Sequence, residues 1–180
     1  MIPTCLTDFF NQSKIKEALA ENDLDYCYTE LYKNSSFYNG SFYDTTPAFT
    51  MMLLKSGINP LNYNLKAIYP YQFYKQTGFG SDLILSNNIT WIGQYSFRGC
   101  TDITKLVVGQ NVTNIRAGAF RECSEIEEVV IPDNVGAIGD LTFWDCINLK
   151  EVTIPERFNT PELLKHIFGE NYQSINFTFI

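Results

Sequence analysis

The sequence lacks the features of an exported or membrane-embedded protein. Its first residues, MIPTCLTDFFNQSK, contain no basic segment followed by an apolar run, so they do not indicate a secretory signal. No stretch approaches the roughly 18 consecutive apolar residues that a transmembrane helix needs. We therefore expect a cytoplasmic protein with no membrane partner.

The chain is also poor in the residues that carry catalysis. It has a single histidine, His166, and no GxSxG, P-loop or HExxH pattern. A zinc site needs paired ligands at short spacing, supplied by several Cys or His residues, and the sequence does not offer such a set. Its five cysteines, without an export signal, read as free thiols. We expect no enzymatic activity, no cofactor and no metal.

Basic residues are scarce as well. Thirteen Lys and Arg residues stand against twenty Asp and Glu residues, which gives a formal net charge of −7. Residues 81–180 hold thirteen acidic and seven basic residues, so most of the excess lies there. Phosphate-backbone binding requires a concentration of positive charge, so no nucleic-acid partner is expected. A length of 180 residues fits one domain with a modest appendage.

Repetition is what the sequence has in abundance. Apolar residues recur with a step of 23 in seven columns. The columns include Ile92, Ile115, Ile138; Phe97, Phe120, Phe143; Cys100, Cys123, Cys146; Leu106, Val129, Val152; and Val108, Ile131, Ile154. Within each copy, L-x-x-V-x-I alternates as a strand does, and I-G-x-x-x-F-x-x-C has the spacing of a short helical turn. One strand and one turn per 23 residues predict a solenoid.

The phrase VTNIRAGAFRECSEIEEVVIPDNV, residues 112–135, resembles the BspA-like class of leucine-rich repeats. That class follows the pattern I-x-x-I-G-x-x-A-F-x-x-C-x-x-L-x-x-V-x-I-P, and the resemblance covers roughly residues 68–158. It implies an α/β (mixed) fold, a short right-handed solenoid with a parallel sheet on its concave side. It also implies a buried cysteine ladder and a binding or adhesion role without catalysis.

We predict three parts. Residues 1–67 form a helical N-terminal cap region, with helices beginning near Thr7 and Asp23 and a third helix that starts at Thr46 and Pro47 and stops at Gly57. Residues 68–158 hold the repeats. Residues 159–180 form a capping repeat, with a helix that starts near Thr160 and stops at Gly169 and a final strand.

Strand alternation predicts the residues that face outward from the sheet. Positions 106 and 108 point inward, so the neighbouring positions point out. The outward columns are Asp82, Lys105, Glu128, Glu151 and Ile84, Val107, Val130, Thr153, continued by Asn176 and Thr178. An apolar line bordered by charges is the anatomy of a protein interface. The alternative is that β-branched residues simply suit strands.

Two tryptophans are further candidates for partner binding. Trp91 and Trp144 lie outside the repeating apolar columns, and Trp is enriched at interface hot spots. Packing of either ring against a neighbouring coil is the alternative.

The sequence therefore predicts a non-enzymatic protein-binding module that acts through its concave sheet. A narrower hypothesis is a phage or mobile-element protein that binds and inhibits a host defence protein in the host cytoplasm. It rests on the short acidic chain and on LLKSGINPL, residues 53–61, which resembles segments preceding such repeats in bacterial and phage proteins. The alternatives are a surface adhesion module and a self-assembling structural or virion subunit. The strand SINFTFI, Ser174–Ile180, would serve the latter, because an open edge can form a homo-oligomer by strand pairing.

Overall fold

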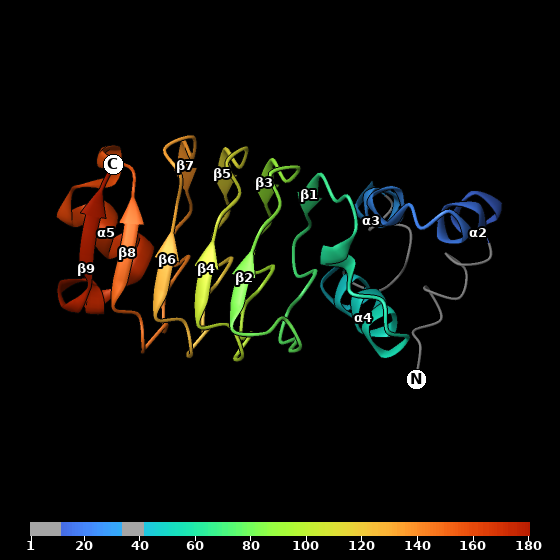
Figure 1. The fold of residues 1–180 in the computed structure, drawn as a ribbon, viewed down its shortest axis with the longest axis horizontal. Helices are drawn as coiled ribbons and strands as arrows, with labels where there is room; N and C mark the ends of the chain where they lie inside the picture. The colour runs from blue at the N-terminus through green and yellow to red at the C-terminus, as the bar shows by residue number, and fades with distance from the viewer. Residues whose placement is uncertain (1–11, 34–41) are drawn as a thin grey trace.

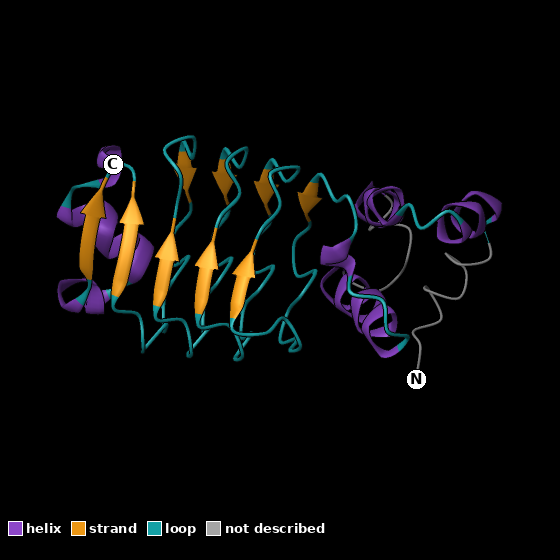
Figure 2. Ribbon diagram, in the orientation of Figure 1, coloured by secondary structure: helices purple, strands orange, loops and turns teal. Residues whose placement is uncertain are grey.

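The computed structural model describes residues 12–33 and 42–180. Its repeats form a row of coils, with the N-terminal helices at one end and a helix and strand at the other (Figure 1). Two parallel sheets run along the row, as Figure 2 shows in orange. The predicted α/β solenoid with parallel strands is confirmed.

The larger sheet has five strands, in the order β2-β4-β6-β8-β9. Their bounds are β2 (Asp82–Ile84), β4 (Lys105–Val107), β6 (Glu128–Val130), β8 (Glu151–Ile154) and β9 (Asn176–Phe179). The smaller sheet has four strands, in the order β1-β3-β5-β7. Their bounds are β1 (Ala67–Ile68), β3 (Trp91–Ile92), β5 (Asn114–Ile115) and β7 (Ala137–Ile138). Each strand pairs with its equivalent one coil later.

The smaller sheet corrects the predicted helical turn. The Ile of each I-G pair lies in a short strand, and the following F-x-x-C segment forms turns. Two positions per coil have positive φ, for example Tyr95 at 52° and Glu122 at 61°, which an α-helix does not tolerate. The turn amides also bond to the next coil, as Phe97 N does to Ala119 O at 2.8 Å. Each turn therefore combines local bonds, such as Cys100 N to Phe97 O at 3.1 Å, with bonds to the next coil, and no α-helix forms.

Aromatic rings form the centre of the core. Phe73, Phe97, Phe120, Phe143 and Phe168 are buried and stack one on the next, with ring centroids 4.9–5.5 Å apart. Because each ring covers the ring of the next coil, the ladder ties the coils together.

The cysteine column is buried beside these rings. The Sγ atoms of Cys100, Cys123 and Cys146 donate to the carbonyl oxygens of Phe73, Phe97 and Phe120, at 3.1, 3.0 and 3.2 Å. All three thiols are free and buried, as the sequence indicated. Desolvation raises the pKa of Cys123 to about 12 and holds those of Cys100 and Cys146 well above their ordinary values.

Within residues 12–33 and 42–66, three helices precede the coils: α2 (Ser13–Ala20), α3 (Leu24–Lys33) and α4 (Phe42–Lys55), followed by the 3-10 turn η1 (Pro60–Asn62). The predicted start of the first helix at Thr7 lies outside the described residues. The predicted start of the third helix is wrong, because α4 begins at Phe42 and Pro47 lies inside it. Proline has no N–H to donate, so this longer helix lacks one backbone hydrogen bond at Pro47.

The N-terminal helices pack directly on the first coil. Thr29 Oγ1 and Tyr69 OH are 2.7 Å apart, and Lys66 N donates to Asp25 Oδ1 at 2.9 Å. The rings of Tyr28 and Tyr69 stack with centroids 6.2 Å apart. These are contacts that a cap would make, and the division of the chain at residue 67 stays a prediction.

The C-terminal segment contains η2 (Glu156–Phe158), α5 (Pro161–Phe168) and η3 (Glu170–Ser174). Thr160 is the N-cap of α5, and its side chain accepts from Leu163 N at 3.3 Å. Pro161 is the first helical residue, and Gly169 ends the helix with φ +81°. The predicted helix start and stop are confirmed.

Candidate functional site

The outward residues of the five-stranded sheet stand in two lines across the strands. Backbone pairing aligns Asp82, Lys105, Glu128, Glu151 and Asn176 in one line, and Ile84, Val107, Val130, Thr153 and Thr178 in the other. The residues between them, such as Leu106 and Val129, are fully buried. The structure therefore places the predicted strand residues together on one outer face.

The first line is charged and partly neutralised within the molecule. Lys105 Nζ lies 2.8 Å from Glu128 Oε1, on the neighbouring strand. Glu151 Oε1 accepts a hydrogen bond from Asn176 Nδ2 at 2.8 Å. The Lys105–Glu128 pair is about 40% exposed and adds little stability by itself. Asp82 has no such pair among the described residues, so uncompensated negative charge remains at Asp82 and Glu151.

The second line, Ile84, Val107, Val130 and Thr153, is named here the apolar seam. Ile84 is 70% exposed, and the other three side chains are half-buried. Neighbouring strands lie about 4.8 Å apart, so the seam spans roughly 14 Å. An isoleucine exposed to this degree loses favourable burial unless another surface covers it.

Trp91 lies on a different surface. It belongs to the four-stranded sheet, where it aligns with Asn114 and, one strand further, Ala137. Its half-buried ring meets the ring of Tyr69 edge-on, with centroids 5.5 Å apart. The structure therefore does not bring Trp91 together with the apolar seam.

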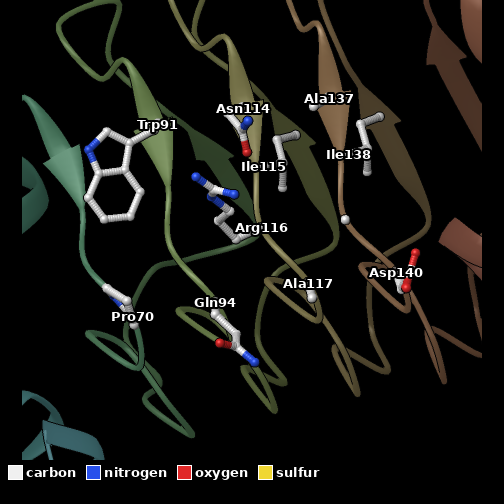
Figure 3. Close-up of a pocket in the computed structure, with 11 residues that line it drawn as sticks. Pro70, Trp91, Gln94, Asn114, Ile115, Arg116, Ala117, Ala137, Ile138 and Asp140 are labelled. Atoms are coloured by element: carbon white, nitrogen blue, oxygen red, sulfur yellow. The ribbon is translucent and has the colours of Figure 1, made fainter.

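Trp91 instead forms one wall of a groove of about 840 Å³ (Figure 3). Ala117 and Ala137 also line the groove, and their small side chains leave space along it (Figure 3). Gln94, Arg116 and Asp140 supply hydrogen-bond donors and acceptors along the groove. Sequence reasoning missed these three residues because it did not predict the second sheet. The step of 23 that relates Gln94, Ala117 and Asp140 was the signal available.

Trp144 lies in the row of turns that follow the short strands, named here the turn ridge (residues 94–99, 117–122 and 140–145). It occupies the position that Arg98 and Arg121 have in the preceding coils. Its ring packs over Gly169, where an added Cβ would lie 2.9 Å from Trp144 Cε3. The Trp144 ring therefore packs against a neighbouring coil, which was the alternative to partner binding. Trp144 is separate from the apolar seam.

The turn ridge also carries a cluster of cationic side chains and aromatic rings. Arg98 lies over the rings of Tyr74 and Tyr95, at 5.9 and 5.5 Å from their centroids. Arg98 Nη2 also lies 2.6 Å from Glu122 Oε1, and Arg121 Nε lies 3.3 Å from the same oxygen. The hydrogen bond from Arg98 lowers the pKa of Glu122. The positive charges of this cluster are thus largely neutralised by Glu122 within the protein.

The described residues form neither a metal-ligand cluster nor a membrane-spanning helix. Among residues 12–33 and 42–180, no group of three or more His, Cys, Asp or Glu side chains is arranged to hold a metal ion. Over the same residues, no helix is long and apolar enough to cross a membrane. His166 is exposed, with Nδ1 3.6 Å from Asp140 Oδ1. The expected absence of enzymatic activity stays a prediction.

Comparison with known proteins identifies the repeat. No curated protein matches the sequence. A leucine-rich repeat protein of known structure from Bacteroides ovatus ATCC 8483 is similar, with 25% identity and a TM-score of 0.54. The match covers 64% of this chain and 28% of that one, so this chain spans less than a third of that protein's length. Six copies of the BspA type leucine-rich repeat region match residues 66–179. Because this match covers more than half of the sequence, the chain belongs to the BspA-type leucine-rich repeat family.

Proposed function

We propose that this protein binds another protein through the outer face of its five-stranded sheet. The observation that carries the proposal is the apolar seam, in which the 70%-exposed Ile84 continues into Val107 and Val130 without interruption. Repeat folds of this type commonly mediate protein–protein interaction or adhesion.

The seam and the charged line beside it would have different roles. Apolar side chains at the centre of an interface supply affinity when a partner excludes water from them. Charges at its border mainly set association rate and specificity. Lys105 and Glu128 already pair with each other, so Asp82 and Glu151 favour a partner with basic residues at the two ends of an apolar strip.

The narrower hypothesis of a phage or mobile-element protein adds that the ligand is a host defence protein. The short, acidic chain and the segment LLKSGINPL, residues 53–61, motivate it, and a negatively charged surface suits the basic face of a protein that handles nucleic acid. The adhesion alternative uses the same surface and differs in where the ligand is found.

The proposal is tested by comparing two pairs of substitutions from the same two coils. Val107→Arg/Val130→Arg places charge in the seam. Asn114→Arg/Ala137→Arg places the same charge on the outer face of the four-stranded sheet, inside the groove. A protein captured from native-host lysate by the unmodified chain is purified and titrated against all three proteins by calorimetry, after circular dichroism has verified their folds.

We expect the seam variant to bind at least tenfold more weakly, because the partner would have to remove water from two arginine side chains. The groove variant should bind as tightly as the unmodified chain. Equal binding of the seam variant and the unmodified chain would contradict the proposal. Loss confined to the groove variant would move the binding surface to the four-stranded sheet.

A further inference from the structure

The strand β9 is the edge strand of the five-stranded sheet (Figure 1). It pairs with β8 through Asn176 N, which donates to Lys150 O at 2.8 Å, and Ile180 N, which donates to Ile154 O at 3.1 Å. Alternate residues of a strand turn their backbone groups to opposite sides. The N–H and C=O groups of Phe177 and Phe179 therefore face the open edge, and within the described residues no strand pairs with them.

This edge lacks the protection that sheet edges usually carry. Natural proteins discourage edge pairing with charged side chains, prolines or very short strands. At the other end of the same sheet, β2 carries the exposed Asp82, and in the smaller sheet the edge strand β7 has only two residues. The four-residue β9 lies in NYQSINFTFI, residues 171–180, which contains no charged residue and no proline.

The occupant that fits this edge is a second copy of the chain. The strand reads the same in both directions about Thr178, because Phe177 and Phe179 flank it, so two antiparallel copies place equivalent residues opposite each other. No charged side chain of residues 171–180 opposes this contact, although the net charge of each chain is −7. Equal patches related by a two-fold axis form a closed dimer.

We propose that β9 pairs antiparallel with β9 of a second copy, about a two-fold axis at Thr178. In this register Phe177 of each copy exchanges both backbone hydrogen bonds with Phe179 of the other. Thr178 then faces Thr178 of the second copy, a cross-strand pair that stabilises sheets. Asn176 faces Ile180, whose side chain is 50% exposed in the single chain and becomes covered.

The pairing also has a consequence for binding. Thr178 continues the line of Ile84, Val107, Val130 and Thr153, so the two apolar seams meet at the axis and form one line across both sheets. A dimer would present two copies of the binding surface side by side, which raises avidity toward a repeated or symmetric partner. The pairing itself does not depend on the proposed function.

Thr178 is exposed, so it can be changed with little effect on folding. We expect the unmodified protein to show twice its 20.6 kDa mass by light scattering. Thr178→Lys and Thr178→Glu should each be monomeric, because like charges would face each other at the axis. An equimolar mixture of the two should regain the dimer mass. Thr153→Lys, the same change one strand inward, should leave the dimer intact.

A monomeric unmodified protein would overturn the proposal, as would a Thr178→Lys variant that still dimerises. Calorimetry with the seam variant is independent of this result, so failure of the dimer and failure of the proposed function are separate outcomes.

The register has its own test. Cα atoms of a non-hydrogen-bonded antiparallel pair lie about 4.5 Å apart, within the range of a disulfide. Thr178→Cys should therefore cross-link the dimer under mild oxidation, as seen on a non-reducing gel. Asn176→Cys should not, because its counterpart lies four residues away along the paired strands. Cross-linking of Asn176→Cys alone, or cross-linking of the unmodified chain to the same extent, would overturn the proposed register.

Discussion

At the scale of the residue, the tight coils depend on single positions with a left-handed backbone. Gly118 is one of them, with φ +62°, and the ring of Tyr95 lies where its Cβ would be. Only glycine takes this conformation without strain, and here it also makes room for an aromatic ring. The positive φ of its own turn and the Tyr95 ring of the preceding coil therefore both require glycine at this position.

We predict that Gly118→Ala lowers the free energy of unfolding by about 2 kcal/mol, from backbone strain and the contact with Tyr95. Gly136→Ala is the matched control, because the nearest atom to its added Cβ is 3.8 Å away and its φ is not positive. That variant should be unchanged or slightly more stable. Urea unfolding measures both, and equal effects at the two positions would show that the strain argument is wrong.

At the scale of the element, the C-terminal helix shows how a short segment is specified locally. Thr160, Pro161 and Gly169 set its start and stop, and its buried Leu164, Ile167 and Phe168 attach it to the core. Such local signals can be read from sequence because they involve neighbours along the chain. The α4 helix differs, since its Thr46 and Pro47 resemble a start signal, yet the helix already begins at Phe42 and continues through the proline.

We predict that Thr160→Ala destabilises the protein by about 1 kcal/mol, because the N–H of Leu163 loses its acceptor. Thr160→Ser keeps a capping hydroxyl and should be close to the unmodified protein. The measurement is the urea midpoint of each variant. A Ser variant as unstable as the Ala variant would mean that the threonine methyl, rather than the cap, matters.

At the scale of the whole molecule, the buried thiols link stability to pH. The pKa of Cys123 is raised to about 12 from an ordinary value of 9.0, because burial penalises the thiolate, and that of Cys27 is raised to about 12 for the same main reason. Above pH 9 the unfolded thiols lose their protons while the folded ones keep them. The unfolded state then binds fewer protons, so the free energy of unfolding falls as pH rises from 9 toward 12 and is unaffected by these groups below pH 9.

We predict that Cys123→Ala reduces the slope of the free energy of unfolding against pH, above pH 9, by about 1.4 kcal/mol per pH unit. This is the slope that one ionising thiol contributes. Urea unfolding of the variant and the unmodified protein between pH 8 and pH 11 gives the two slopes. Parallel curves would show that the thiol of Cys123 ionises in the folded protein.

The sequence by itself determined the repeat, the strand faces and the C-terminal helix. A step of 23 and a two-residue alternation placed Leu106 and Val129 inside, and Val107 and Val130 outside, because these patterns follow directly from coil length and strand geometry. Only the tertiary structure decided the rest. The second sheet, the groove beside Trp91 and the packing of Trp144 on Gly169 depend on hydrogen bonds and contacts between coils. Such contacts join residues that are distant along the chain, and local propensity does not encode them.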